Sequence, residues 1–474
     1  MMRAAMAHVE PNQKIAPRLG LGDAVSIIVG IVVGTAIFKT PAMVFQNTPG
    51  PWAALTAWLV GGLLSLCGAL CYAELATTYP RDGGDYEYLS RGYGRWLGFF
   101  FGWAQLTVII SGNIGIMAYA FADYAARVLP NLASGIVWLA VLPVVALSLA
   151  NALGTVAGKT TQNVLTVAKI LGLAAIVAAG ISVAIGDQQI PLAAPAPAVE
   201  SAATLPAFGL AMVFVLYGYG GWNHAAFVAA EVRDQRRNMP RALLLGLAAI
   251  TAIYLTINAA YLAVLGFDGA RGSATPAADV LALAIGPSGA AMMGLLVMIS
   301  AAGAINGMIF TGARVFATWG ADFPRLAWLG RWSSRTRAPV TAIAVLGIIA
   351  VLQMLTVGTS TGRRWFDVAL TSVRLSPLPW DEYFGGFETL VAGTAPVFWL
   401  FFLLTGVALF VLRIRDRGRP RPFSTPLFPL PPIVFCLTCG YMLYASIAYA
   451  KWLTVLGVVP LALGVPAYFI ARRA

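Results

Sequence analysis

About twelve apolar runs divide this chain, each long enough to cross the hydrocarbon core of a bilayer, which takes about 20 residues of helix. Only 11% of the 474 residues are charged and 59% are hydrophobic. This composition excludes a soluble enzyme, a disordered protein and a secreted disulfide scaffold. The expected fold is an all-α polytopic membrane protein with spans at residues 22–46, 53–79, 96–126, 135–153, 161–185, 206–230, 242–266, 288–320, 339–357, 388–412, 430–450 and 453–471.

The distribution of basic residues predicts the orientation. An even number of spans puts both termini on one side. If that side is the cytoplasm, the inner segments hold 22 of the 31 Lys and Arg residues and the outer segments hold seven. Because cytoplasmic loops are usually the basic ones, we expect a multi-pass protein of the cell membrane with both termini cytoplasmic. The net charge of +12 then indicates contact with an anionic inner leaflet and no nucleic acid.

Glycine clusters interrupt two of the spans. These glycines are Gly30 and Gly34 in the first span and Gly218, Gly220 and Gly221 in the sixth. Close helix packing is one explanation, because small residues four positions apart often line helix contacts. Three glycines within four positions favour an unwound segment instead. Breaks at matching positions of two five-helix halves are typical of a transporter with its substrate site near the membrane midplane.

The ends of two broken helices suit a zwitterion. The N-terminal end of a half-helix presents unpaired N–H groups, which favour a carboxylate. The C-terminal end of another presents carbonyls, which favour an ammonium group. Four acidic residues lie near span ends and leave the middle of the membrane free of carboxylates: Asp23, Glu74, Asp123 and Glu231. A free amino acid therefore matches the expected site.

Four motifs resemble the amino acid–polyamine–organocation superfamily, and within it the L-type amino acid transporter branch. They are Gly30-x-x-x-Gly34-Thr35-Ala36-Ile37-Phe38-x-x-Pro41, Tyr72-Ala73-Glu74 with Tyr79-Pro80-Arg81-x-Gly83-Gly84, Tyr219-Gly220-Gly221-Trp222-Asn223 with Glu231, and Gly303-x-x-Asn306-Gly307 with Arg314. The resemblance covers nearly the whole chain. It implies a LeuT-like 5+5 inverted repeat of about 12 transmembrane helices, two of them C-terminal additions to the repeat.

The implied domain order follows the spans. It comprises a cytoplasmic tail at 1–20, a first five-helix repeat at 21–186, an external linker at 187–205, a second repeat at 206–413 with an external insertion at 358–387, and a basic loop with helices 11 and 12 at 414–474. The insertion is longer than the family's usual connection.

The resemblance also implies roles for individual residues. The N–H groups of Thr35 and Ala36, after Gly34, would bind the substrate carboxylate, and the carbonyls of Val32, Tyr217 and Gly220 would bind its amine. Tyr217 would also serve as the outer gate. The remaining expected substrate-binding residues are Val108, Ile109, Asn113, Gly218, Gly221, Asn223 and Phe398. Two of these positions depart from the family pattern, since Ala36 replaces a glycine and Phe398 a polar residue.

Five further residues are candidates for coupling or gating. Lys169 lies within the fifth span, where the family places a lysine in the position of a sodium ion, and it would act there as either a fixed cation or a proton carrier; snorkelling to the interface is the alternative. His224 is either a core histidine or a proton-coupling site. Glu74, Arg81 and Arg314 would form a cytoplasmic gating network, with loop ordering as the alternative.

The implied function is secondary transport of amino acids, by exchange or by proton symport, with no cofactor and no obligatory partner subunit. No carboxylate is expected in the side-chain pocket, so neutral substrates are favoured over cationic ones. A permease for cationic amino acids or polyamines is the alternative. A membrane-embedded enzyme would need a deep ionisable cluster, and Cys436 and Cys439 have neither a second pair nor a nearby histidine. A transport-dead sensor on the same fold is a third reading.

Overall fold

The computed structural model describes residues 17–129, 131, 135–185, 207–273, 275–372, 374–380 and 386–472. The expected linker at 187–205 and most of the tail at 1–20 lie outside these ranges. The helices are α1 (Leu21–Val32), α2 (Ala36–Gln46), α3 (Pro51–Thr78), α4 (Asp85–Tyr93), α5 (Arg95–Ala104), α6 (Ile110–Val128), α7 (Ile136–Ala152), α8 (Thr155–Ile185), α9 (Ala207–Gly218), α10 (His224–Phe227), α11 (Gln235–Gly272), α12 (Pro276–Ile285), α13 (Ser288–Asp322), α14 (Val340–Gly358), α15 (Ser360–Ser372), α16 (Gly386–Arg415), α17 (Leu430–Ala450), α18 (Val455–Ala462) and α19 (Gly464–Arg472).

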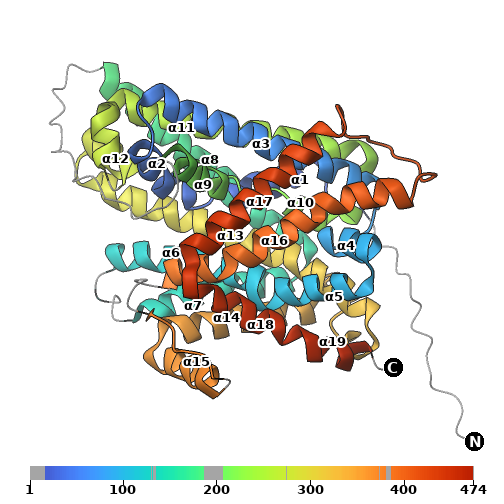
Figure 1. The fold of residues 1–474 in the computed structure, drawn as a ribbon. Coiled ribbons are helices and arrows are strands. Elements are labelled where there is room, and N and C mark those ends of the chain that lie inside the picture. The colour runs from blue at the N-terminus through green and yellow to red at the C-terminus, as the bar shows by residue number, and fades with distance from the viewer. Residues whose placement is uncertain are drawn as a thin grey trace, which may run out of the picture.

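The all-α expectation is confirmed. Every expected span coincides with one helix or with helices on either side of an interruption. Among the described residues, eight helical stretches are long and apolar enough to cross a membrane, and the shorter apolar helices include α1 and α9, the first pieces of the two interrupted spans. Length and apolar composition together therefore account for the helical bundle of Figure 1.

Three helices lie between the expected spans. α4 follows a turn in which Gly83 and Gly84 have positive φ. α12 begins at Pro276 and is followed by Gly286 with φ 67°, which is the usual pairing of an N-terminal proline with a C-terminal glycine. α15 occupies part of the 358–387 insertion and packs against α14. The third span is also interrupted, by a π-helical turn at Gln105–Ile109 between α5 and α6.

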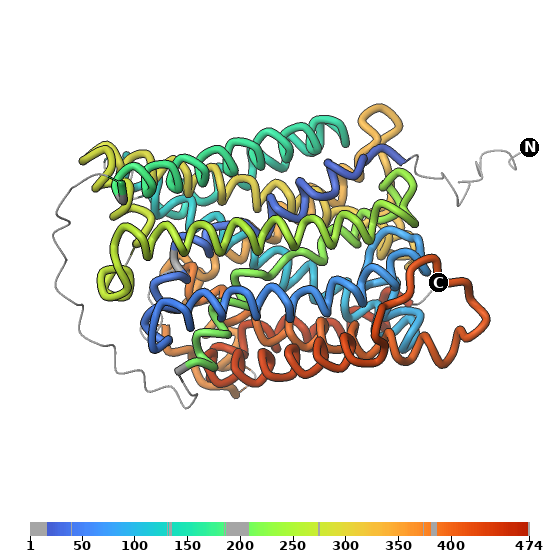
Figure 2. The backbone as a smooth tube through the Cα atoms, turned by 90° about the horizontal axis from the view of Figure 1, so that it is seen from above, coloured from blue at the N-terminus to red at the C-terminus, as the bar shows by residue number. Residues whose placement is uncertain are grey.

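The pieces of the two broken spans lie side by side in the bundle (Figure 2). α1 packs against α8, α11 and α13, and α2 packs against α9 and α11. Glycines permit this approach. A Cβ atom on Gly307 of α13 would lie 2.4 Å from Cγ1 of Ile31, and one on Gly30 would lie 2.0 Å from Nε2 of Gln162 in α8. The glycines of the motifs thus bring neighbouring helices against the first break.

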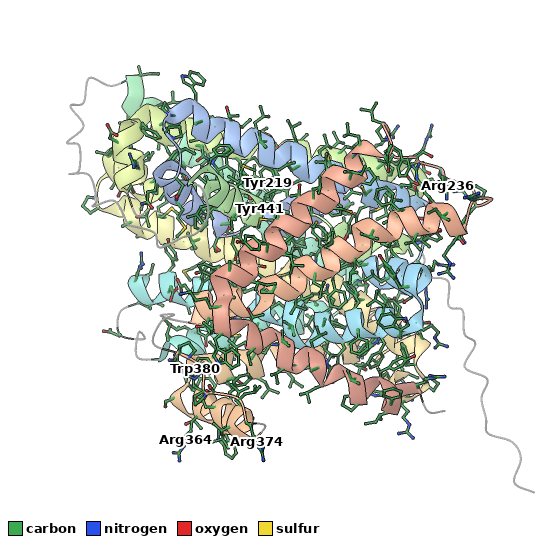
Figure 3. All side chains as sticks on the ribbon, in the orientation of Figure 1. Tyr219, Arg236, Arg364, Arg374, Trp380 and Tyr441 are labelled. Carbon is green, nitrogen blue, oxygen red and sulfur yellow. The ribbon has the colours of Figure 1, made fainter. Side chains whose placement is uncertain are left out.

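One end of the bundle, called the basic end below, carries the start of α1, the helix α4 and the arginine-rich segments 233–241, 325–337 and 413–421. Arg236 lies there, whereas Arg364 and Arg374 extend from the α15 region near the opposite end (Figure 3). α1 begins and α19 ends at the basic end (Figure 2). An even number of crossings is therefore consistent with the path of the chain.

Both glycine-rich stretches are unwound. α1 ends at Val32 and α2 begins at Ala36. In the sixth span, residues 219–223 separate α9 from α10. Gly221 has φ +108°, a conformation that side chains with a Cβ rarely adopt. The interpretation of these stretches as helix breaks is therefore supported. Close helix packing, the other explanation, also applies at Gly30, which lies against α8.

A tyrosine from α11 joins the two breaks. The Tyr254 hydroxyl lies 3.0 Å from the Val32 carbonyl oxygen and 2.7 Å from the Gly218 carbonyl oxygen. The side chain is fully buried, and its ring packs edge-on against those of Trp58 and Tyr219. One hydroxyl group thus lies within hydrogen-bonding distance of a carbonyl from each broken helix, and its single proton is shared between them. No feature of the sequence had singled out this residue.

We expect Tyr254→Phe to lower the free energy of unfolding by about 1–3 kcal/mol, because a buried carbonyl that loses its donor costs about that much. The ring, and with it the aromatic packing, is retained. Thermal unfolding of the purified protein in detergent measures the change.

The matched control is Tyr261→Phe on the same helix. Tyr261 is also fully buried, but its hydroxyl has no hydrogen-bond partner among the described residues. Its removal should leave the Tm unchanged or slightly raised. Equal Tm values for the two variants would contradict the bridging role of Tyr254.

Candidate functional site

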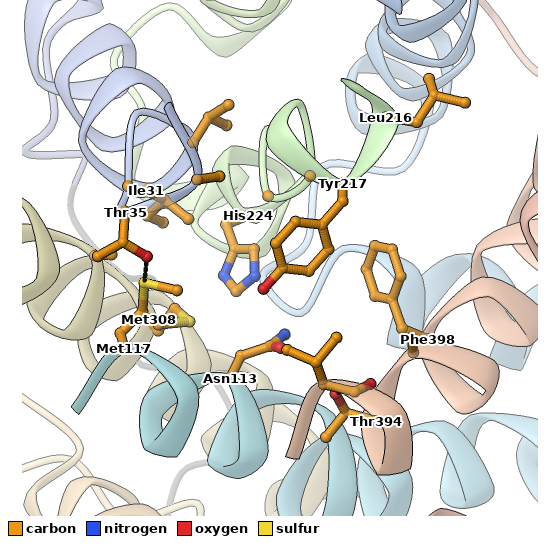
Figure 4. A pocket seen from close by; sticks show the side chains of 18 of the residues that line it. Ile31, Thr35, Asn113, Met117, Leu216, Tyr217, His224, Met308, Thr394 and Phe398 are labelled. Atoms are coloured by element: carbon orange, nitrogen blue, oxygen red, sulfur yellow. Dashed lines mark hydrogen bonds between the residues drawn. The ribbon is translucent and has the colours of Figure 1, made fainter. Parts of the chain in front are cut away.

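A cavity of about 110 Å³ lies where the two breaks meet (Figure 4). Five parts of the chain line it: the first break with α1 and α2, the second break with α9 and α10, α6, α13 and α16. The lining residues are Ile31, Val32, Gly34, Thr35, Ala36, Asn113, Met117, Leu216, Tyr217, Gly220, Gly221, His224, Ala304, Met308, Val391, Thr394, Ala395, Phe398 and Trp399. Most of this wall is apolar.

Nine of the expected substrate-binding residues, together with His224, lie on the cavity wall. The nine are Val32, Gly34, Thr35, Ala36, Asn113, Tyr217, Gly220, Gly221 and Phe398. In Figure 4 the side chains of Tyr217, His224 and Asn113 face the same space, with Phe398 at its side. The breaks and three neighbouring helices thus bring residues far apart in sequence together.

The other four expected binding residues are not on the wall. Val108 and Ile109 are buried in the π-helical turn before α6, where the ordinary helical spacing from Asn113 no longer predicts which way a side chain points. Gly218 faces Trp58. Asn223 interacts with Asp85 at the start of α4 rather than with the cavity.

Several wall residues were missed by the sequence analysis, and helical spacing could have found some of them. Met117 lies one turn after Asn113 on α6, and its sulfur is 3.6 Å from the Thr35 hydroxyl. Thr394 and Ala395 lie one turn before Phe398 on α16. Ala304 and Met308 follow the same spacing on α13, next to the Asn306-Gly307 motif.

Three side chains cap the carbonyls at the end of α1. The Lys169 ammonium donates to the Gly30 carbonyl at 2.7 Å. The Tyr254 hydroxyl reaches Val32, and the Ser300 hydroxyl donates to the Val33 carbonyl at 3.0 Å. These caps come from α8, α11 and α13 respectively. The C-terminal end of α1 is therefore largely satisfied by the protein itself.

The N-terminal end of α2 is different. No acceptor for the N–H of Thr35 is present among the described residues, and the first N–H groups of any helix have no partner within it. Thr35 and Ala36 lie on the cavity wall. The cavity therefore receives unpaired N–H groups and the positive end of a helix dipole, an arrangement that binds anionic groups.

The carbonyls expected to bind an amine are partly occupied. The Val32 carbonyl accepts from Tyr254, and the Tyr217 carbonyl accepts from the Gly220 N–H at 3.1 Å. Each carbonyl oxygen has two lone pairs. The Val32 carbonyl also accepts from the Gly34 N–H at 2.7 Å, so one acceptor position remains at Tyr217 and none at Val32. All three of Val32, Tyr217 and Gly220 line the cavity.

Lys169 does not snorkel. Its side chain is fully buried, and a Cβ on Gly303 of α13 would lie 3.4 Å from its Nζ atom. The amino group therefore lies between α8, α13 and the carbonyl end of α1. This places an ionisable amine directly behind the first break.

His224 is held by a hydroxyl chain. Its Nδ1 atom lies 2.9 Å from the Thr311 hydroxyl oxygen, and that hydroxyl donates to the Gly307 carbonyl at 2.8 Å. Because the hydroxyl proton is used there, Nδ1–H is the donor to Thr311. The ring thus has a fixed orientation, and His224 lines the cavity.

The expected gating residues all lie toward the basic end, but in separate clusters. Glu74 accepts from Arg413 at 2.8 Å and from the Thr425 N–H at 2.7 Å. Arg81 donates to Asp322 at 2.6 Å. The third cluster pairs Arg314 with Glu231 at 2.7 Å. Another ion pair joins Lys159 to Asp23 at 2.9 Å. The basic end is therefore closed by several ion pairs.

Comparison with known proteins agrees with this architecture. A family model described as Amino acid permease matches residues 19–465. Similar proteins include the serine/threonine exchanger SteT of Bacillus subtilis (strain 168), 27% identical over 98% of this chain and 99% of that protein. The human large neutral amino acids transporter small subunit 2 is 29% identical over 95% of this chain and 80% of that protein. The human b(0,+)-type amino acid transporter 1 is 28% identical over 90% of this chain and 82% of that protein.

A solved structure shares the fold. Mhp1, a nucleobase-cation-symport-1 family transporter in a closed conformation with bromovinylhydantoin bound, superposes with a TM-score of 0.53, covering 93% of this chain and 95% of that one at 13% identity. The expected LeuT-like transporter fold is thus confirmed. Because the family model spans both broken helices and every helix that lines the cavity, this chain belongs to the amino acid permease family, whose members are membrane transporters and not enzymes.

Proposed function

We propose that this protein exchanges neutral amino acids across the cell membrane by alternating access, with the cavity at the two breaks as its substrate site. The single observation that carries the proposal is the polarity of the first break, where the carbonyls of α1 are capped and the N–H groups of α2 open into the cavity. Exchange is favoured over proton symport because the relative aligned over nearly its full length is named an exchanger.

The backbone of the substrate would span both breaks. Its carboxylate would accept from the N–H groups at Thr35 and Ala36. Its ammonium group would use the free lone pairs at Tyr217 and Gly220, since those of the Val32 carbonyl are used by Gly34 and Tyr254. A zwitterion satisfies both sets, because each buried backbone group left unpaired costs about 1–3 kcal/mol. Amines without a carboxylate and acids without an amine should bind weakly.

The rest of the cavity favours an uncharged side chain. No lysine, arginine, aspartate or glutamate is among its lining residues, and its polar side chains away from the first break are those of Asn113, Tyr217, His224 and Thr394. Burying a charged substrate side chain there would leave the charge unpaired, at a cost of several kcal/mol. This argument disfavours arginine, lysine, glutamate and polyamines.

The proposed orientation places the basic end in the cytoplasm, following the bias of Lys and Arg. With this orientation both termini would be cytoplasmic, and the repeat boundaries proposed are those expected from the sequence. We propose that the chain works without a partner subunit, since the bacterial relative SteT aligns over 99% of its length with this single chain.

The first prediction concerns the substrate class. In proteoliposomes loaded with unlabelled amino acid, leucine, alanine, serine or phenylalanine should inhibit uptake of a labelled neutral amino acid. Arginine, glutamate and putrescine should inhibit at least tenfold less well. Inhibition by arginine or putrescine without inhibition by any neutral amino acid would overturn the substrate assignment.

The second prediction concerns coupling. Because the Lys169 amino group would take the place of a sodium ion behind the break, uptake should be equal in sodium and in potassium buffers. Lys169→Ala should reduce uptake at least tenfold while the protein remains folded by size-exclusion chromatography.

Lys159→Ala is the matched control on α8. Lys159 pairs with Asp23 in a partly exposed contact, which is worth at most about 1 kcal/mol. This variant should retain most of the uptake. Strict dependence on external sodium, or normal kinetics of Lys169→Ala, would exclude the proposed role of Lys169.

A further inference from the structure

The basic end contains more buried carboxyl groups than buried cations at one place. Asp82, Glu231 and Arg314 are 3%, 1% and 1% exposed. Arg314 donates from Nε to Glu231 at 2.7 Å. One oxygen of Asp82 accepts from the N–H of Ala230 at 2.9 Å. The other oxygen of Asp82 is buried and has no hydrogen-bond partner among the described residues.

Arg314 has no donor directed at Asp82. Besides Glu231, its guanidinium donates to the Phe310 carbonyl at 2.7 Å and to the Thr155 hydroxyl at 3.3 Å. The guanidinium also lies over the Phe310 ring. Arg314 therefore forms its ion pair with Glu231. It attracts the Asp82 carboxyl group electrostatically but makes no hydrogen bond to it.

The other charged groups near Asp82 have partners of their own. Arg81, its neighbour in the chain, is directed to Asp322 and Glu87. Asp85 on α4 accepts hydrogen bonds from Tyr72 and Thr405. The hydroxyl of Tyr88, also on α4, interacts electrostatically with the Asp82 carboxyl group. On α8, Lys159 is paired with Asp23.

The charges of this cluster balance only if one of the two carboxyl groups holds a proton. Two buried carboxylates against one guanidinium would leave a net negative charge without solvent, which is strongly unfavourable. A proton on one carboxyl removes it. Burial first, and the Glu231 carboxylate second, raise the pKa of Asp82 to about 8, so Asp82 rather than the ion-paired Glu231 is the group that holds the proton.

The cluster lies where several segments close the basic end. Asp82 is in the turn between α3 and α4, and Glu231 ends the 3-10 turn Ala229–Glu231 that follows α10. The N–H groups of Arg18 and Leu19, just before α1, donate to the Glu231 carbonyl. The Gly83 N–H donates to the Phe227 carbonyl at 3.0 Å. These contacts join the two broken spans to each other at the basic end.

We propose that Asp82 is a proton-binding site of the closed basic end: its carboxyl takes up a proton when these segments pack together and releases it to the cytoplasm when they separate and water reaches it. This inference rests on the proposed transport cycle for its consequence, since only a cycle that opens the basic end would hydrate Asp82. The bond that forms and breaks is the O–H bond of the carboxyl group, with water as the exchanging partner.

The sign of the pH dependence follows from linkage. The closed form binds one more proton than the open form at any pH between about 4, the ordinary pKa of Asp, and about 8. Each unit fall in pH within this window therefore favours the closed form by up to tenfold, and closure weakens as pH rises toward 8. Above pH 8 no further change arises from this site.

The direct test is infrared spectroscopy of the purified protein between pH 5 and pH 9. We expect the carbonyl stretch of a protonated carboxyl group to persist at pH 7 and to disappear near pH 8. Asp82→Asn should abolish this component while keeping an acceptor for the Ala230 N–H. Burial raises the pKa of Asp85 to about 6, so the Asp85 component should be lost at lower pH and remain in the variant.

Two further variants guard against misfolding and misassignment. Glu231→Gln removes the neighbouring negative charge and should shift the Asp82 component to lower pH. Asp322→Asn, in a partly exposed ion pair of the same end, should leave the component unchanged. A component that survives Asp82→Asn, or an Asp82 that titrates near pH 4, would overturn the proposal.

The functional test is exchange in proteoliposomes at equal pH on both sides. Wild-type exchange should slow by up to tenfold per unit as pH falls from 8 to 6. Asp82→Asn should show no such dependence and should exchange at pH 8 at least as slowly as the wild type does at pH 6. A wild-type pH dependence that persists in Asp82→Asn would exclude the site. If no amino acid is exchanged at all, the substrate proposal fails, whereas the infrared titration still tests Asp82.

Discussion

Pairing of backbone polar groups in the absence of water is the constraint on which the rest of this structure depends. A helix that stops inside a membrane leaves carbonyls and N–H groups without partners, and each must be satisfied by the protein or by a ligand. The carbonyls at the end of α1 are satisfied by Lys169, Tyr254 and Ser300. The N–H groups at the start of α2 are left at the cavity. The carbonyl side of the break is thus hydrogen-bonded by the protein, whereas the N–H side is not. A bound carboxylate would supply the missing acceptors there.

The caps also link the break to the surrounding helices. Lys169, Tyr254 and Ser300 stand on α8, α11 and α13, which surround α1, and the Tyr254 hydroxyl reaches the second break as well. A movement of any of these helices relative to α1 would therefore disturb a buried hydrogen bond, so the breaks and the helices around them are expected to move as a unit. A substrate that bridges both breaks would add to the same connections rather than form separate ones.

Much of the fold could be predicted because the bilayer restricts the choices. Apolar length predicted the spans, and glycine density predicted the two unwound segments. The site was predictable where it depends on these backbone breaks, as at Thr35 and Gly220. It was not predictable where a local irregularity changes the direction of side chains: the π-helical turn at Gln105–Ile109 removes Val108 from the cavity wall. Tyr254 was missed because a tyrosine in an apolar helix has no distinctive neighbour in the sequence. Its role exists only where α11 meets two broken ends.

The buried charges of the basic end call for a different explanation from the rest of the packing. A buried ion pair such as Arg314–Glu231 adds little or no net stability, because desolvation offsets most of the attraction. An apolar contact of the same size would hold the end closed at least as firmly. Charged groups differ from apolar ones in that water competes for them, so a contact made of ion pairs and one excess carboxyl loses its advantage once solvent enters. Such a contact separates more readily than an apolar core of equal area, which is the property that an end of a transporter needs if it is to close and open in every cycle.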